Sequence, residues 1–167
     1  KLFTFHVRKT DMPQPQVTLD GERKFIAIPA GRDVEIAPAP TGETMPPSSE
    51  PTAEVPLARL AYARSGDKGD SSNVAIIARR PEFLPLLRRE VTAERMLGHF
   101  AGIVDGPAER FEAPGLSALN FLMQHALGGG GMASLRIDPQ GKAFGQMALE
   151  MMIPVPRNWI DQGLIKA

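Results

Sequence analysis

The stretch Leu57-Ala-Arg-Leu-Ala-Tyr-Ala-Arg-Ser-Gly-Asp-Lys-Gly-Asp-Ser-Ser-Asn-Val-Ala-Ile-Ile-Ala78 organises the chain, because two apolar runs flank a polar segment punctuated by glycine. Residues 57–63 suit a strand. Residues 73–78 form an unbroken, β-branched run typical of a strand covered on both faces. The residues between them, 65–72, predict a polar loop. We therefore expect two strands joined by a loop at the start of the main folded unit.

Downstream of this stretch the pattern alternates between helical and extended segments. In chain order we expect a helix over 81–91, a helix capped by Thr92, a strand over 109–113, a helix over 116–127 and a hairpin of 133–137 with 143–153. In the segment 116–127 apolar side chains share one helical arc, and glycines follow at 128–131. This order predicts an α+β sandwich, in which helices cover one face of an antiparallel-rich sheet. A ferredoxin-like arrangement is the closest simple architecture.

Upstream, residues 1–36 predict a small β-rich piece. Alternating apolar residues over 3–7 predict a strand already in progress, so we interpret this piece as the end of a larger N-terminal domain. Residues 17–28 predict a hairpin, because Asp20-Gly21 supplies the positive φ values of a tight turn.

Residues 37–54 carry many prolines among small and polar residues, with almost nothing large and apolar to bury. Such a segment is typical of a linker, acting as an extended spacer or as a strap along a surface. The main domain is therefore expected over 55–167.

Composition excludes several classes of protein. Lys plus Arg (19) balances Asp plus Glu (19), and no basic patch with interleaved aromatics is present, which argues against nucleic-acid binding. No apolar run approaches the roughly 20 residues of a membrane span, and the first residues do not resemble a signal peptide, so we expect a cytoplasmic protein. The chain has no Cys, and its 3 His residues lack ligand spacing, which argues against a structural zinc site.

The polar segment 64–73 is the main candidate for chemistry. Its glycines allow backbone N–H groups to surround an oxyanion, and its Lys and Arg side chains would attract that negative charge. Its carboxylates could act as a general base or bind Mg²⁺. The proposed catalytic residues are Asp67, Lys68 and Asp70, and the proposed ligand-binding residues are Arg64, Ser65, Gly66, Gly69 and Asn73. The alternative is a plain tight connection, since such turns commonly use these residue types.

Asn120 is a second candidate, because helical projection places its amide on the apolar arc of the expected helix over 116–127. A buried amide must find partners or cost roughly 1–3 kcal/mol. The Asn120 side chain is therefore expected either to hydrogen-bond to neighbouring backbone and hold it in place, or to line a ligand site. The glycine run 128–131 has the same ambiguity, between a flexible connection and a close backbone approach to a ligand.

Several motifs over about residues 55–155 together resemble the small C-terminal domain of the acyclic terpene utilisation (AtuA-like) family. The motifs are Leu60-Ala-Tyr-Ala-Arg-Ser-Gly-Asp-Lys-Gly-Asp-Ser-Ser-Asn-Val74, Thr92-Ala-Glu-Arg95, His99-Phe100, Leu119-Asn-Phe121, Ala126-Leu-Gly-Gly-Gly130, Ser134-Leu-Arg-Ile-Asp138 and Gly141-Lys142.

The resemblance implies a ferredoxin-like fold and a role in the breakdown of terpenes such as citronellol and geraniol, whose intermediates travel as CoA thioesters. A hydratase or lyase step on a branched unsaturated acid or its thioester would suit the loop. The implied partners are that small molecule, the larger N-terminal domain and further copies in a homo-oligomer. The alternative function is a noncatalytic module that binds partner chains. The sequence indicates no particular cofactor.

Overall fold

The computed structural model describes residues 5, 7–29, 31–35, 42–47 and 49–166, and the chain divides into two compact units, Lys1–Pro38 and Ala39–Ala167. In the first unit, strand β1 (Gln16–Leu19) pairs antiparallel with β2 (Glu22–Phe25). Asp20 and Gly21 join them with φ values of 50° and 84°, which confirms the predicted hairpin. The strand expected over 3–7 lies largely outside the described residues.

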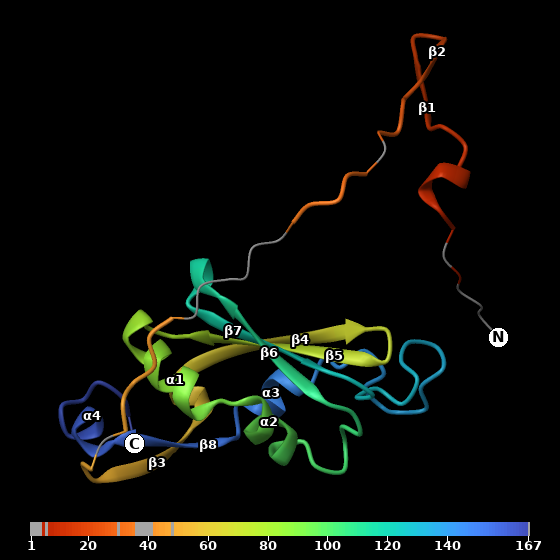
Figure 1. The fold of residues 1–167 in the computed structure, drawn as a ribbon. Helices are drawn as coiled ribbons and strands as arrows, with labels where there is room; N and C mark the ends of the chain where they lie inside the picture. Colours follow the sequence, from red (N-terminus) through yellow and green to blue (C-terminus); the bar gives the residue numbers. More distant parts are fainter. Residues whose placement is uncertain (1–4, 6, 30, 36–41, 48, 167) are drawn as a thin grey trace. The chain divides into compact units, whose positions relative to one another are not determined.

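A four-stranded antiparallel sheet forms one layer of the second unit (Figure 1). Its strands, in spatial order, are β4 (Ala61–Lys68), β5 (Ser71–Ala78), β7 (Ala118–Met123) and β6 (Ala108–Ala113). A separate ladder joins β3 (Thr52–Pro56) to β8 (Met152–Pro156), also antiparallel. Together with the helices, these sheets confirm the predicted α+β class.

The helices and the β3–β8 ladder lie on one side of the four-stranded sheet (Figure 1). The helices are α1 (Leu84–Glu90), α2 (Ala93–His99), α3 (Phe144–Ala148) and α4 (Arg157–Asp161), with 3-10 turns at Lys9–Asp11, Leu57–Arg59, Pro81–Phe83 and Pro114–Leu116. Thr92 caps α2 as predicted, because its hydroxyl accepts a hydrogen bond from the Arg95 N–H at 3.2 Å. None of the helices among the described residues has the length and apolar character needed to cross a membrane.

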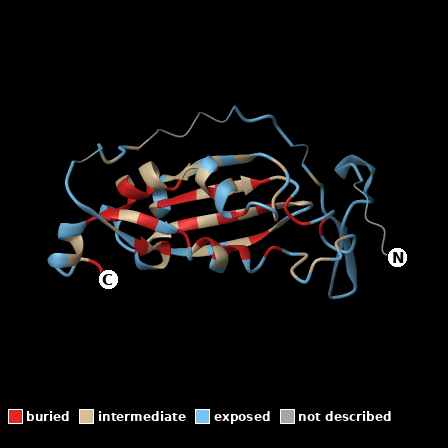
Figure 2. Cartoon of the chain, turned by 90° about the horizontal axis from the view of Figure 1, so that it is seen from below, coloured by how far each residue is buried: buried red, intermediate tan, exposed pale blue. Residues whose placement is uncertain are grey.

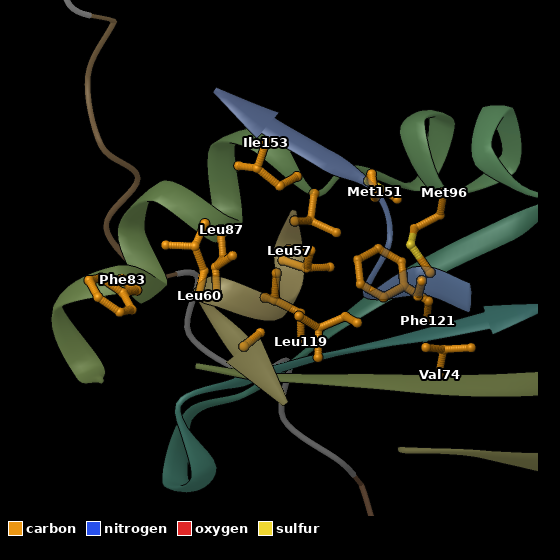
Figure 3. Close-up of a cluster of buried hydrophobic side chains, with 14 of the residues drawn as sticks. Leu57, Leu60, Val74, Phe83, Leu87, Met96, Leu119, Phe121, Met151 and Ile153 are labelled. Carbon is orange, nitrogen blue, oxygen red and sulfur yellow. The ribbon is translucent and has the colours of Figure 1, made fainter. Parts of the chain in front are cut away.

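The core lies between the sheet and this second layer. Because strand side chains alternate, Val74, Leu119 and Phe121 point to the same side of the sheet, and all three are fully buried. Figure 3 shows them facing Met151 and Ile153 of the opposite layer. Seen from that layer, the strands carry alternating bands of buried and partly exposed residues (Figure 2). Burial of this one apolar face is the main force that fixes the register of the sheet.

The other side of the sheet, here called the open face, follows from the same register. Its members are Tyr62, Arg64, Gly66 and Lys68 of β4; Ser71, Asn73, Ala75 and Ile77 of β5; Ala118, Asn120 and Leu122 of β7; and Glu109, Phe111 and Ala113 of β6. Tyr62 and Phe111 remain 54% and 47% exposed. The expectation that residues 73–78 are covered on both faces is therefore wrong, since Ala75 and Ile77 are only half-buried on the open face.

The predicted loop over 65–72 is wrong as well, since nearly all of it belongs to strands. β4 continues to Lys68 and β5 begins at Ser71, so the turn contains only Gly69 and Asp70. Polar residues occur here within strands because β4 is an edge strand and one side of the hairpin is the open face. The 57–63 strand is shifted, since residues 57–59 form a 3-10 turn before β4 begins.

The helix predicted over 116–127 is strand β7, which lies between β5 and β6. Leu119, Phe121 and Met123 also alternate with period two, and pairing with two neighbouring strands selects that period over the helical one.

The hairpin predicted over 133–153 is also wrong, although a turn does form where the Gly141 N–H donates to the Asp138 carbonyl at 3.3 Å. The chain continues from this turn into α3 instead of a strand. β8 then pairs with β3, whose first residues, 52–54, fall in the segment interpreted as linker.

Candidate functional site

Strand geometry separates the candidate residues of the hairpin into two groups. Arg64, Gly66 and Lys68 belong to the open face, whereas Ser65 and Asp67 belong to the core side of β4. Asp67 and Lys68 therefore do not converge, and Lys68 Nζ instead donates to the Asp67 carbonyl oxygen at 3.2 Å.

Asn73 and Asn120 meet at the middle of the open face. The side-chain Nδ2 of Asn73 donates to Oδ1 of Asn120 at 3.3 Å, which links β5 to β7. In the register of the sheet, Asn73 lies opposite Gly66 and Asn120 lies opposite Ala75. Because these two neighbours are small, the amide pair is only half-buried and can offer its remaining donors and acceptors to a ligand.

Lys142 brings a positive charge to this amide pair. A Cβ atom placed on Gly66 would lie 3.3 Å from Lys142 Nζ and 3.8 Å from Asn73 Oδ1, so the ammonium group reaches across the strand at Gly66. Lys142 also shares a cavity of about 160 Å³ with Arg64 and Gln146, at the outer edge of β4. Neither cation forms an ion pair or a side-chain hydrogen bond with the described residues.

The backbone of Lys142 is held in place by two polar side chains. The Asp138 carboxylate accepts hydrogen bonds from the N–H groups of Lys142 and Ala143, at 2.9 and 2.8 Å. The Ser65 hydroxyl donates to the Lys142 carbonyl at 3.1 Å and accepts from the Gly145 N–H at 2.8 Å. Ser65, predicted to bind a ligand, thus ties the start of α3 to β4 and fixes where the Lys142 side chain begins.

Asp70 joins the β4–β5 turn to the loop that follows β7. One carboxylate oxygen accepts from the Gly129 N–H at 2.6 Å, and the other lies 3.1 Å from His125 Nδ1. Its carbonyl oxygen accepts from the N–H groups of Ala126 and Leu127, both at 3.0 Å. The Gly129 N–H, followed by the His125 side chain, lowers the pKa of the Asp70 carboxyl. Because these contacts stabilise the ionised form, the geometry favours a structural role over that of a general base.

The glycine run beside Asp70 packs against the same turn. All four glycines have positive φ, and a Cβ atom on Gly130 would lie 2.0 Å from the Gly69 carbonyl oxygen. Gly69 itself has φ of 66° and forms the turn, whereas Gly66 lies within the strand. Residues 66–69 were expected to surround an oxyanion with backbone N–H groups, but Gly66 is instead part of the β4–β5 pairing. The glycine run 128–131 was expected either to be a flexible connection or to approach a ligand closely, and Gly130 instead lies close to the backbone of Gly69.

Among the described residues, no group of three or more His, Asp or Glu side chains is placed to hold a metal ion. Asp67 and Asp70, which the sequence offered as Mg²⁺ ligands, take different surroundings, since Asp70 is engaged by Gly129 and His125.

Sequence reasoning missed Lys142 and Gln146. They lie more than 70 residues beyond Arg64, and only the packing of α3 against β4 brings them near it. The Gly141-Lys142 pair is part of the family resemblance, which was the available signal, but nothing local gives it a role in binding.

Comparison with protein families gives a match to the AtuA ferredoxin-like domain over residues 55–154, more than half of the chain. No curated protein and no solved structure matches the chain. The matched segment runs from strand β3 to strand β8 and so contains the whole four-stranded sheet, the amide pair and Lys142. The chain therefore belongs to the AtuA ferredoxin-like domain family, which is connected with acyclic terpene utilisation.

Proposed function

We propose that the open face binds the carboxylate of a branched unsaturated acid of terpene catabolism, or the phosphate groups of its CoA thioester. The observation that carries this proposal is the position of Lys142 Nζ beside the Asn73–Asn120 amide pair. Carboxylates and phosphates are recognised by cations together with neutral donors, and charge-assisted hydrogen bonds are about twice as strong as neutral ones. Arg64, on the same cavity, supplies a second cation whose planar group suits a bidentate contact.

The rest of the open face suits the hydrocarbon part of such a ligand. Ala75 and Ile77 lie along β5 next to the amide pair, and Phe111 lies opposite Asn120 on β6. These side chains leave apolar surface partly exposed around a polar centre, which is the usual composition of a small-molecule site. The acid group would thus bind at the β4 edge, and the branched chain would extend toward β6.

In this proposal the domain supplies binding and orientation, not proton transfer. Asp67 points to the other side of the sheet, and Asp70 is occupied by Gly129 and His125. If the protein performs a hydratase or lyase step in the cytoplasm, its acid and base come from groups outside the open face. The larger N-terminal domain that the family resemblance implies and further copies of the chain are the partners we propose for that role.

The proposal is tested by calorimetric titration with geranate, with geraniol as the uncharged comparison. Geranate should bind and geraniol should not. Lys142→Gln should weaken geranate binding about tenfold, the loss of one charge-assisted contact. This variant retains the backbone bonds to Asp138 and Ser65, so its thermal unfolding should match that of the unsubstituted protein.

Two matched variants sharpen the titration. Lys24→Gln removes an exposed lysine from strand β2 and should leave binding unchanged. Lys68→Gln removes an open-face lysine beyond the amide pair and should have a small effect. Equal affinities for Lys142→Gln and the unsubstituted protein, or a larger loss for Lys68→Gln, would contradict the assignment.

A second candidate function is a noncatalytic module that binds another copy through the open face. The exposed rings of Tyr62 and Phe111, with alanines between them, favour this reading. Phe111→Glu should then convert an assembly into monomers in light scattering, whereas Lys142→Gln should not. Monomers throughout the accessible concentration range would exclude it.

A further inference from the structure

Strand β3 leaves one edge of the β3–β8 ladder open. The Arg157 N–H donates to the Pro51 carbonyl at 2.9 Å, in line with the β3–β8 register. Because backbone groups alternate in direction along a strand, Thr52 and Glu54 direct their N–H and C=O groups away from β8. These groups have no partner among the described residues. Figure 1 shows β3 at the margin of the second unit.

The opposite edge of the ladder, along β8, is closed. The same alternation directs Met152, Pro154 and Pro156 away from β3. The two prolines have no N–H to donate, and the Met152 carbonyl accepts a hydrogen bond from Arg95 Nη2 at 2.6 Å. Proline and a capped carbonyl are common ways of keeping further strands from an edge. The ladder can therefore be extended at β3 and not at β8.

A cavity of about 270 Å³ lies between β3 and helix α4. Its lining residues are Ala53, Glu54 and Val55 of β3 and Arg157, Ile160 and Asp161 of α4. Side chains of successive strand residues point to opposite faces, so a cavity lined by three of them in a row lies along the edge of the strand. Thr52 and Glu54 are themselves exposed. The space beside their outward backbone groups is therefore open to an incoming strand.

We propose that β3 pairs antiparallel with β3 of a second copy, about a two-fold axis that passes beside Ala53. In this register Thr52 of each copy lies opposite Glu54 of the other, and the two pairs exchange four hydrogen bonds that use every outward N–H and C=O group of both residues. Pro56, the next outward residue, has no N–H, so the edge offers little more to a longer partner strand. A short edge that satisfies itself in this way suits the isologous interface of a two-fold dimer.

The charges beside the edge are complementary under the same two-fold axis. Glu54 and Asp161 are acidic and Arg157 is basic, and all three are exposed. None of them forms an ion pair within the part of the chain that the structure describes. Arg157 lies next to Pro51, which the register places opposite Val55 of the second copy. Arg157 thus approaches the end of the partner strand that carries Glu54, and opposite charges meet across the interface.

Disulfide cross-linking tests the register directly, because the chain has no Cys and a single introduced thiol can react only with another copy. Ala53 would face itself across the axis as a non-hydrogen-bonded pair, whose Cα atoms are about 4.5 Å apart, within the range of a disulfide. Ala53→Cys should therefore form linked dimers under mild oxidation. Ala101→Cys, at an exposed position after α2, should not. Equal cross-linking of the two variants would overturn the proposal.

Light scattering of the full chain tests the backbone pairing, and the unsubstituted protein should form dimers. Glu54→Pro removes an N–H that the β3–β8 ladder does not use, and it should weaken the association about tenfold or more. Glu54→Gln keeps this N–H and should still form dimers. An unsubstituted protein that stays monomeric at all accessible concentrations would refute the pairing, as would equal association of Glu54→Pro.

These experiments are independent of the proposed open-face site, because β3 does not belong to the four-stranded sheet. Lys142→Gln should form dimers normally, and Glu54→Pro should bind geranate normally. Dimers that are lost in Phe111→Glu but retained in Glu54→Pro would assign the contact to the open face and overturn the pairing through β3.

Discussion

Gly130 is the residue at which the loop after β7 meets the β4–β5 turn most closely. It has φ of 66°, and a Cβ atom there would lie 2.0 Å from the Gly69 carbonyl oxygen. The neighbouring Gly131 also has a positive φ, of 47°, but has open space around it. Both positions disfavour a side chain conformationally, but only Gly130 excludes one by contact with backbone that cannot move aside.

We expect Gly130→Ala to lower the free energy of unfolding by about 3 kcal/mol or more, because the strain of positive φ adds to a steric clash. Gly131→Ala should cost only about 1–2 kcal/mol, the strain alone. Urea unfolding monitored by the fluorescence of Trp159 measures both. Equal losses would show that the turn and the loop are not packed as described.

Strand β7 shows why the sequence predicted some elements and not others. The helices at 84–90 and 93–99 and the β1–β2 hairpin carry local signals, namely proline in the first turn, a Thr92 cap and Asp20-Gly21. The apolar residues in 118–123 fit both the helical period and the period of two of a strand. Which structure forms depends on the neighbouring strands, which lie elsewhere in the chain. The candidate site was predictable in part for the same reason. Arg64 and Asn73 lie on the two strands of one hairpin, whereas Lys142 comes near them only through tertiary packing.

The two faces of β6 and β7 lead to a second prediction. Phe121 is fully buried on the core side, whereas Phe111 lies on the open face and is 47% exposed. Phe121→Ala should therefore cost about 3–5 kcal/mol of stability, through lost apolar burial and the cavity left behind. Phe111→Ala should cost less than about 1 kcal/mol. Chemical denaturation of both variants is the measurement, and similar costs would contradict the assignment of faces.

Arg88 connects three parts of the second unit. Its Nε donates to Glu112 of β6 at 3.0 Å, and its Nη1 donates to the Glu43 carbonyl at 2.9 Å. Arg89 likewise donates to the Pro46 carbonyl at 2.7 Å. The proline-rich segment around 43–46 is thereby held along helix α1, and the Arg88–Glu112 pair is almost fully buried, with each side chain 10% exposed.

Removing only one partner of this pair should be costly. Arg88→Met leaves the Glu112 carboxylate buried without its counter-ion, and one of its oxygens already has no partner among the described residues. We expect a loss of about 3–5 kcal/mol in thermal or chemical unfolding. The double variant Arg88→Met with Glu112→Leu should be more stable than Arg88→Met alone. A double variant that is less stable to unfolding than either single variant would contradict this account.

The pairing of β3 with β8 limits how early the domain can finish folding while the chain is being synthesised. Thr52 of β3 aligns with Pro156 of β8, so this ladder joins the beginning of the matched segment to its end. A nascent chain can close the β4–β5 hairpin soon after its residues leave the ribosome, but β3 must wait for β8 until translation of the domain is nearly complete. Until then, the apolar side chains that β8 covers are available to chaperones.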